Sequence, residues 1–312
     1  MSNLQGMELS YIPSASQICD QIQDDECVVF THIPKAAGTT LDRLLKGIGM
    51  VNQLPWKRAY GTVYDQYLGE GKRESLADFL EWKEAARQKV RILTGHVPFG
   101  IHEHLPRKAK YVTILRDPVS RTVSHYKMGI SRGGWSADDS MESVFERGGL
   151  VSDVQVRMLA GVVSAEETVT QQTLDTALEN LSQHYMLVGF SNTFNEFTSL
   201  LLGYLGAPNA LLGNEQSARV ELSDEQEQHL KHIAQEFNRW DSMLYEQAEA
   251  IAQQKSAQFR NGAWSEINDK QQNTLVASSQ VRIQNKEYSI IQPNQFDLVI
   301  KKLFRSGVEI KT

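Results

Sequence analysis

The segment FTHIPKAAGTT, residues 30–40, decides the fold expected of this chain. It begins at the end of a short β-branched run, VVF, and reaches Pro34, which cannot donate the hydrogen bond that would extend a strand. Beyond Thr39, leucine and isoleucine side chains recur at helical spacing as far as Gly49, which is placed to end a helix. The segment is therefore predicted to be a strand-to-helix turn, with its helix at residues 39–48.

The rest of the chain alternates between strands and helices. Buried strands are predicted at VRILTG (90–95), KYVTILR (110–116) and MLVGF (186–190), and Pro118 opens a helix at residues 119–127. The other predicted helices are 75–89, 138–147, 152–160, 171–183, 193–205 and 223–258, the last broken near Asn238. Strand and helix in this order favour an α/β fold with right-handed crossovers. We expect a three-layer, P-loop-like fold with a central parallel sheet flanked by helices.

Two regions depart from this alternation. Residues 51–75 have no clean period but contain several aromatic side chains, which either line an acceptor site or fill a core. Residues 261–280 are polar and rich in turn formers, as is typical of a linker, and the strand-like residues 281–291 follow. The chain is predicted to consist of a main domain at residues 1–258 and a C-terminal extension at 259–312, to which no role is assigned.

Composition argues against several classes of protein. With 312 residues and a net charge of −6, the chain lacks the basic field that attracts nucleic acid. Its two cysteines, Cys19 and Cys27, are too few for a disulfide framework, and Cys27 is expected to be a buried thiol. No signal peptide begins the sequence, and no apolar stretch reaches the length of a membrane span. We therefore expect a soluble, cytoplasmic protein.

The turn itself has the features of an anion site. Amides at a helix N-terminus are unpaired donors at the positive end of the helix dipole. The nucleotide triphosphatase pattern requires a lysine directly after the last glycine, but here Thr39 follows Gly38 and Lys35 lies three positions upstream of that glycine. An NTPase is therefore disfavoured, and a tight turn with a surface lysine is the alternative to an anion site.

A second cationic turn is predicted after strand 110–116. Arg116 ends this strand, and Ser124 follows eight residues later on the next helix. Ligands of open parallel sheets bind at the carboxyl ends of the strands, so both turns are expected to face one crevice. This arrangement favours a ligand with two separate anionic groups, whereas an arginine paired with Asp117 is the alternative.

Several motifs resemble those of one enzyme family. HIPKAAGTT resembles the 5′-phosphosulfate loop of carbohydrate-type sulfotransferases, the superfamily of the heparan-sulfate 2-O-sulfotransferase-like enzymes, and RDPVSRTVSHY resembles their 3′-phosphate signature. TGHVPFGIHEHL, VQVRMLAG and VGFSNTFNEFTSLL are similar to their later landmarks, so the resemblance covers residues from about 26 to 250 and suggests a soluble, bacterial-type member. The chain departs from the family at Ala36 and Ala37, where a threonine and a glycine are usual.

The resemblance implies a sulfotransferase that uses 3′-phosphoadenylyl sulfate (PAPS) and releases adenosine 3′,5′-bisphosphate (PAP). It implies that Lys35 contacts the oxygen between phosphate and sulfuryl group and that Arg116 and Ser124 bind the 3′-phosphate. The implied cofactor-binding residues are Lys35, Ala36, Ala37, Gly38, Thr39, Thr40, Arg116, Ser124 and Arg157. A saccharide, lipid or small natural product would accept the sulfuryl group through a hydroxyl or an amine.

His96 is the candidate general base. It directly follows strand 90–95 at the expected crevice, and imidazole titrates near neutral pH; a loop histidine bonded to backbone is the alternative. His102, Glu103 and His104 have the wrong spacing for an HExxH zinc site, so no metal is expected and they are assigned to the rim or to acceptor contacts. Two rival functions are an NTP-dependent kinase and a non-catalytic nucleotide- or glycan-binding relative. The sequence gives no oligomeric state.

Overall fold

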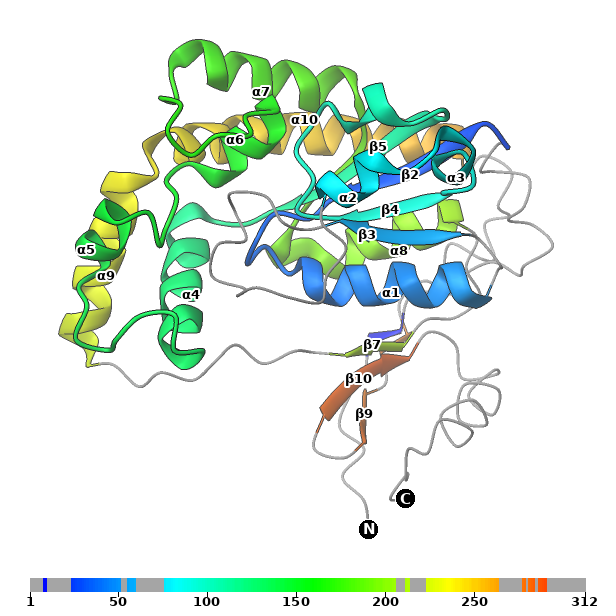
Figure 1. Ribbon diagram of the computed structural model, residues 1–312. Helices are drawn as coiled ribbons and strands as arrows, with labels where there is room; N and C mark the ends of the chain where they lie inside the picture. Colours follow the sequence, from blue (N-terminus) through cyan, green and yellow to red (C-terminus); the bar gives the residue numbers. More distant parts are fainter. Residues whose placement is uncertain are drawn as a thin grey trace.

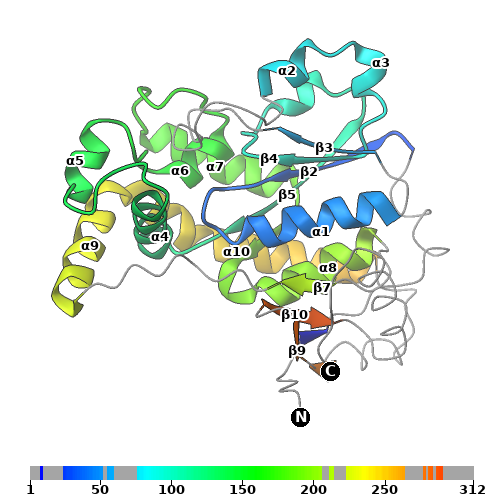
Figure 2. The same ribbon diagram turned by 60° about the horizontal axis from the view of Figure 1, so that its bottom comes forward.

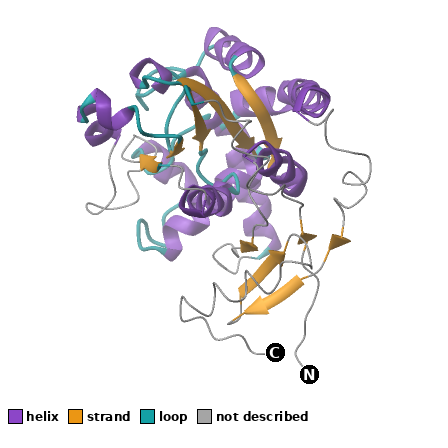
Figure 3. Ribbon diagram, turned by 90° about the vertical axis from the view of Figure 1, so that its right-hand side faces the viewer, coloured by secondary structure: helices purple, strands orange, loops and turns teal. Residues whose placement is uncertain are grey.

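In a computed structural model, the described residues of the chain are 8–9, 24–51, 55–59, 76–205, 211–213, 223–263, 277–278, 280–283 and 286–290. Within them lies a five-stranded sheet of order β3-β4-β2-β5-β6, in which all neighbours are parallel. Its strands are β2 Glu26–Thr31, β3 Trp56–Ala59, β4 Ile92–Gly95, β5 Lys108–Leu115 and β6 Tyr185–Phe190. The predicted central parallel sheet flanked by helices is confirmed (Figures 1 and 3).

Helices cover both faces of this sheet. They are α1 Gly38–Val51, α2 Leu76–Glu81, α3 Glu84–Arg87, α4 Pro118–Ser131, α5 Met141–Glu146, α6 Val154–Ala160, α7 Gln171–Gln183, α8 Phe194–Leu205, α9 Asp224–Phe237 and α10 Arg239–Ala263, with short 3-10 turns η3 Ile101–His104 and η4 Ser191–Thr193. Helix α1 packs on β3 and β4 on one side of the sheet, and α6 and α7 lie on the other side (Figure 1). Helices α4, α5 and α9 form a separate group at one end of the sheet (Figure 2).

The position of β2 follows from its apolar sequence. All of its residues are buried because it lies between β4 and β5, and a parallel strand covered on both faces reads as a continuous apolar run. Cys27 and Val29 point to one face, where they join a core with Leu159 and Leu181 of the covering helices. Cys27 is a free buried thiol, as predicted, and burial raises its pKa to about 12.

Most predicted elements are confirmed, but some boundaries were wrong. Helix α1 continues through Gly49 to Val51, since a glycine inside a helix weakens it without ending it. The single helix predicted at 75–89 is two short helices, α2 and α3, interrupted at Trp82 and Lys83. Strand β3 was missed within 51–75, because this edge strand is only half-buried and carries two basic residues. Residues 60–75 lie outside the described part of the chain.

The C-terminal strands pair with segments from earlier in the chain. A small sheet of order β7-β10-β9 joins Leu211–Gly213, Lys286–Ile290 and Gln280–Ile283, and β1 Glu8–Leu9 pairs with β8 Ala277–Ser278. Figure 3 shows this smaller group of strands beside the main helical layers. The predicted boundary between residues 258 and 259 falls inside α10, and the division into two domains stays a prediction.

Candidate functional site

Three loops meet at one edge of the sheet, as predicted. They follow β4, β2 and β5, which are adjacent strands with the same direction, so their carboxyl ends lie side by side. The first loop begins at His96, the second spans residues 32–37, and the third is Arg116 and Asp117. Helices α1 and α4 begin at this end of the sheet (Figure 1).

The loop after β2 has an unusual backbone. Lys35 and Ala37 have φ values of 66° and 63°, in the left-handed region that costs a residue with a side chain about 1 kcal/mol or more. Strain of this kind is typical of ligand-binding loops, where it aims backbone groups at the ligand. Gly38 is needed for packing, because a Cβ at this position would lie 2.0 Å from Cδ2 of the His32 ring. The turn therefore presents the N-terminus of α1 at the edge of the sheet.

A direct contact joins the two cationic turns. The Arg116 guanidinium donates from Nη1 to the carbonyl oxygen of Lys35 at 2.9 Å, across 81 residues of sequence. The Lys35 ammonium lies 3.5 Å from Sδ of Met128 on α4. Among the described residues, no carboxylate forms an ion pair with the side chain of Lys35 or Arg116. Two cations are thus held together; burial lowers the pKa of Arg116, and the neighbouring Asp117 opposes this effect without forming an ion pair with it among the described contacts.

Electrostatics at this pair favour binding of an anion. Burial, together with the charges of Arg132 and Arg116, lowers the pKa of Lys35 to about 8. Burial also lowers the pKa of Arg116. An anionic group placed between them would relieve the repulsion and restore the charge of the ammonium.

Ser124 supplies a further polar group. It lies on α4, and its Oγ is buried without a hydrogen-bond partner among the described residues. Buried hydroxyls in folded proteins usually have a partner, so an orphaned one marks a place for a ligand or water. Together with the cationic pair, this hydroxyl fits the requirements of a phosphate group.

His96 lies in a group of buried histidines. Its side chain is 4% exposed, and its ring meets the His32 ring edge to face with centroids 4.8 Å apart. His32 in turn stacks on Phe30, and burial followed by the charges of neighbouring cations and His96 lowers its pKa well below the usual range. The backbone before His96 requires Gly95, since a Cβ there would lie 1.8 Å from the carbonyl oxygen of Ala59. The His32 ring and Gly95 thus fix the position of His96 at the end of β4.

Other predicted residues lie in different surroundings. Arg157 is buried and donates to the carbonyl oxygens of Ser152, Ser164 and Glu167, so it supports the loop after α6. No described contact joins it to the Lys35 and Arg116 pair, and its cofactor role stays a prediction without support from its contacts.

Four other residues predicted to bind the cofactor, at this turn and the start of α1, differ in exposure. Ala36 is buried, and its amide donates to the carbonyl oxygen of Ile33 at 3.2 Å. Ala37 and Thr39 are exposed, and Thr40 is half-buried. The exposed amide-bearing residues are therefore accessible to a ligand at the start of α1.

His102 lies away from the site. Its Nδ1 is 3.0 Å from the Tyr111 hydroxyl, and its ring packs among Phe99, Tyr111 and His184. Tyr111 lies within β5 and pairs with Tyr185 at the start of β6, so this cluster is set back from the edge where the strands end. These contacts do not support an acceptor contact for His102.

The Gln155 side chain holds the backbone of Arg116 with two hydrogen bonds, here called the Gln155 clamp, which the sequence did not predict. The Gln155 side chain accepts from the Arg116 amide at 3.0 Å and donates to the Arg116 carbonyl at 2.9 Å. Asp241 in turn accepts from the amides of Gln155 and Val156 at 3.2 and 2.8 Å, and it forms a buried ion pair with Arg121. The only signal was that Gln155 belongs to the VQVRMLAG motif. Helices α4, α6 and α10 thereby fix the strand end that carries the arginine.

No group of three or more histidine, cysteine, aspartate or glutamate side chains among the described residues is arranged to hold a metal ion. None of the described helices is both long and apolar enough to cross a membrane.

Comparisons with known proteins agree with these features. Heparan-sulfate 6-O-sulfotransferase 1 from Cricetulus griseus is 24% identical over 293 residues, covering 75% of this chain and 69% of its own. Heparan sulfate 2-O-sulfotransferase 1 from Pongo abelii is 23% identical over 203 residues, covering 57% of this chain and 54% of its own. A crystal structure of mouse sulfotransferase SULT7A1 complexed with PAP is 12% identical and covers 70% of this chain and 68% of its own, with a TM-score of 0.32, too low to compare the two sites.

A family model described as the sulfotransferase family matches residues 21–294. The match includes all three loops at the edge of the sheet and the helices that support them. Because the model spans most of its length, the chain belongs to the sulfotransferase family.

Proposed function

We propose that this protein transfers a sulfuryl group from PAPS to a hydroxyl group of a saccharide. The single observation that carries the proposal is the 2.9 Å hydrogen bond from the Arg116 guanidinium to the Lys35 carbonyl. It joins two cationic turns at the carboxyl ends of adjacent strands. The relatives named above are sulfotransferases of heparan sulfate, which supports a saccharide acceptor over a lipid or another small molecule. A cytoplasmic location and a bacterial-type origin stay predictions.

The two turns suit the two ends of the donor. Lys35 and the amides at residues 38–40 would hold the 5′-phosphosulfate end, because helix N-terminal amides and an ammonium both stabilise negative charge. Arg116 and Ser124 would hold the 3′-phosphate; one guanidinium donor is used by the Lys35 carbonyl and others remain for the ligand. Each turn thus serves one charged end.

The chemistry then assigns roles to two side chains. The acceptor oxygen forms a bond to sulfur as the bond from sulfur to the 5′-phosphate oxygen breaks, so negative charge grows on the departing phosphate. Lys35 stabilises this charge more in the transition state than in the ground state, which is the condition for catalysis. His96 takes the proton of the acceptor hydroxyl.

Transfer of label from PAPS to an acidic oligosaccharide tests this function. We expect Lys35→Ala to lower kcat by at least about a hundredfold with a smaller loss of PAP affinity, as for other groups that stabilise transition-state charge. His96→Ala should abolish transfer while PAP still binds. Lys46→Ala, which removes an exposed lysine from helix α1 directly after the turn, is the control and should retain activity.

Three outcomes would contradict the proposal. Equal losses of kcat and PAP affinity in Lys35→Ala would remove its transition-state role. Stronger thermal stabilisation by ATP and Mg²⁺ than by PAP would favour an NTP-dependent kinase. Tight PAP binding without transfer to any acceptor would favour a non-catalytic relative.

A further inference from the structure

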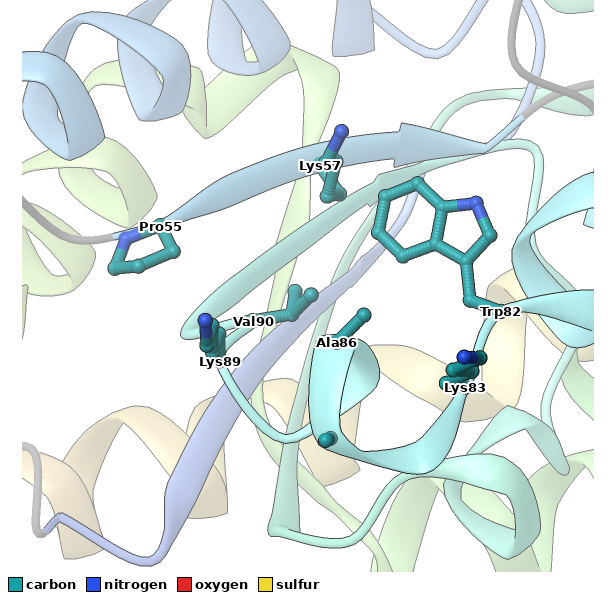
Figure 4. A pocket seen from close by; sticks show the side chains of 8 residues that line it. Pro55, Lys57, Trp82, Lys83, Ala86, Lys89 and Val90 are labelled. Carbon is teal, nitrogen blue, oxygen red and sulfur yellow. The ribbon is translucent and has the colours of Figure 1, made fainter.

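A hollow lined by lysine and tryptophan lies near the start of strands β3 and β4. It has a volume of about 570 Å³ and is lined by Pro55, Lys57, Trp82, Lys83, Ala85, Ala86, Lys89 and Val90 (Figure 4). Helix α3, which forms one wall, lies at the end of the sheet opposite to α4 (Figure 1). The hollow is therefore separate from the edge that carries Lys35 and Arg116.

The floor of the hollow is apolar and firmly held. Val90 is 2% exposed, and the Trp82 indole packs against the buried Phe79 ring with centroids 5.5 Å apart. The Arg87 guanidinium donates to the Leu80 carbonyl at 2.6 Å, which ties α3 to α2. The half-buried indole thus contributes fixed apolar surface to the hollow.

The rim of the hollow is cationic. Lys57 places its ammonium 4.3 Å from the centroid of the Trp82 ring, and the two side chains lie beside each other in Figure 4. Lys83 and Lys89 are exposed and also line the hollow, Lys83 near Trp82 and Lys89 at the opposite side (Figure 4). No aspartate or glutamate is among the described residues that line the hollow. The whole chain carries a net charge of −6, so this concentration of positive charge is local.

We propose that this hollow binds an acidic saccharide, a sugar chain with carboxylate or sulfate groups. A sugar ring has an apolar face that packs on an indole, and its acidic groups would be attracted by the lysine ammoniums. Charge complementarity selects an anionic ligand, and the apolar floor selects one with a ring surface over a bare phosphate. The inference rests on the proposed function, since it extends the acceptor site of the same enzyme.

The position of the hollow allows one long saccharide to contact both the hollow and the transfer site at His96. Residues 90–95, which include the buried strand β4, connect the hollow at Val90 to His96, and five residues in extended conformation span about 17 Å. A saccharide that follows the surface must cover at least this distance. An octasaccharide is longer than this, whereas a disaccharide is shorter. The hollow therefore increases the affinity for long acceptors, because a second contact on the same chain adds to the first.

Binding of a sulfated, uronate-containing octasaccharide, measured by calorimetry without donor, tests the proposal directly. Lys83→Glu/Lys89→Glu should weaken binding at least about tenfold, because each reversal removes an attraction and adds a repulsion. Lys231→Glu/Arg147→Glu makes the same change of charge at two exposed residues on α9 and at the end of α5, and it should leave the affinity within about twofold. Equal losses in both variants, or no loss in the first, would overturn the proposal.

Two more measurements test the saccharide site separately from the proposed function. In transfer assays with labelled PAPS, Lys83→Glu/Lys89→Glu should raise KM for the octasaccharide more than KM for a disaccharide. Equal changes would show that a long saccharide does not contact the hollow and the transfer site together. Tripolyphosphate is the sugar-free probe; if it binds as tightly as the octasaccharide and loses the same affinity, the saccharide assignment is wrong. The calorimetric results need no transfer, so a failed transfer reaction contradicts the proposed function without deciding the binding site.

Discussion

The affinity for PAP should depend on pH through Lys35. In the free protein the pKa of this ammonium is about 8, because it is partly buried beside Arg132 and Arg116. A phosphate bound between these cations favours the protonated form, so PAP binding is accompanied by proton uptake where free Lys35 has lost its proton. Because the pKa of Lys35 in the folded protein is lowered to about 8, most of its side chains are already protonated below pH 8. As the pH rises above 8, the ammonium loses its proton and the affinity for PAP falls.

The size of the effect follows from the protonated fraction. With a pKa of about 8, about ten in eleven molecules carry the proton at pH 7 and about one in eleven at pH 9. If PAP requires the ammonium, its association constant falls about tenfold over this range, which corresponds to about 1.4 kcal/mol. The phosphate groups of PAP themselves titrate near pH 6, so they are not the source of a change above pH 7.

Calorimetry from pH 7 to 9.5 measures this dependence, and buffers of different ionisation enthalpy report the protons taken up. Lys35→Met keeps the length of the side chain but cannot ionise, so its affinity should be lower and nearly constant above pH 7. A constant affinity in the natural protein, or the same slope in Lys35→Met, would refute the reasoning.

The remaining predictions concern the groups that support the site. Gly38→Ala should lower the affinity for PAP at least about tenfold, because its Cβ would lie 2.0 Å from the His32 ring and displace the turn; unchanged binding by calorimetry would contradict this. Gln155→Ala should weaken PAP binding through Arg116 with a smaller effect on adenosine 5′-phosphosulfate, and equal effects would indicate a general loss of structure. Asp241→Ala should lower the free energy of unfolding by about 3–5 kcal/mol, since it removes a buried carboxylate that faces the Arg121 guanidinium and accepts from the amides of Gln155 and Val156; denaturant titration showing less than about 1 kcal/mol would count against this.

The local pattern of the sequence predicted most of the sheet. Strands β2, β4, β5 and β6 are apolar runs with turn signals beside them, and their order places the turns that carry Lys35 and Arg116 at one edge of the sheet. Strand β3 escaped detection because an edge strand with sequence WKRA has no apolar run and is recognised only by its pairing with β4.

Long-range contacts explain what the sequence did not reveal about the site. The donation of Arg116 to Lys35 crosses 81 residues, and the clamp of Gln155 on Arg116 crosses 39 residues. No periodicity reports such contacts, because they depend on how α4 and α6 pack at the end of the sheet. The cofactor role that a recognised motif suggested for Arg157 stays a prediction; its guanidinium donates to three backbone carbonyl oxygens.

An experimental structure of the protein with bound PAP tests the central claim most directly. The account predicts that the 5′-phosphate contacts Lys35 and the amides of residues 38–40, while the 3′-phosphate contacts Arg116 and Ser124. PAP bound at another place, or in contact with only one of the two turns, would contradict it.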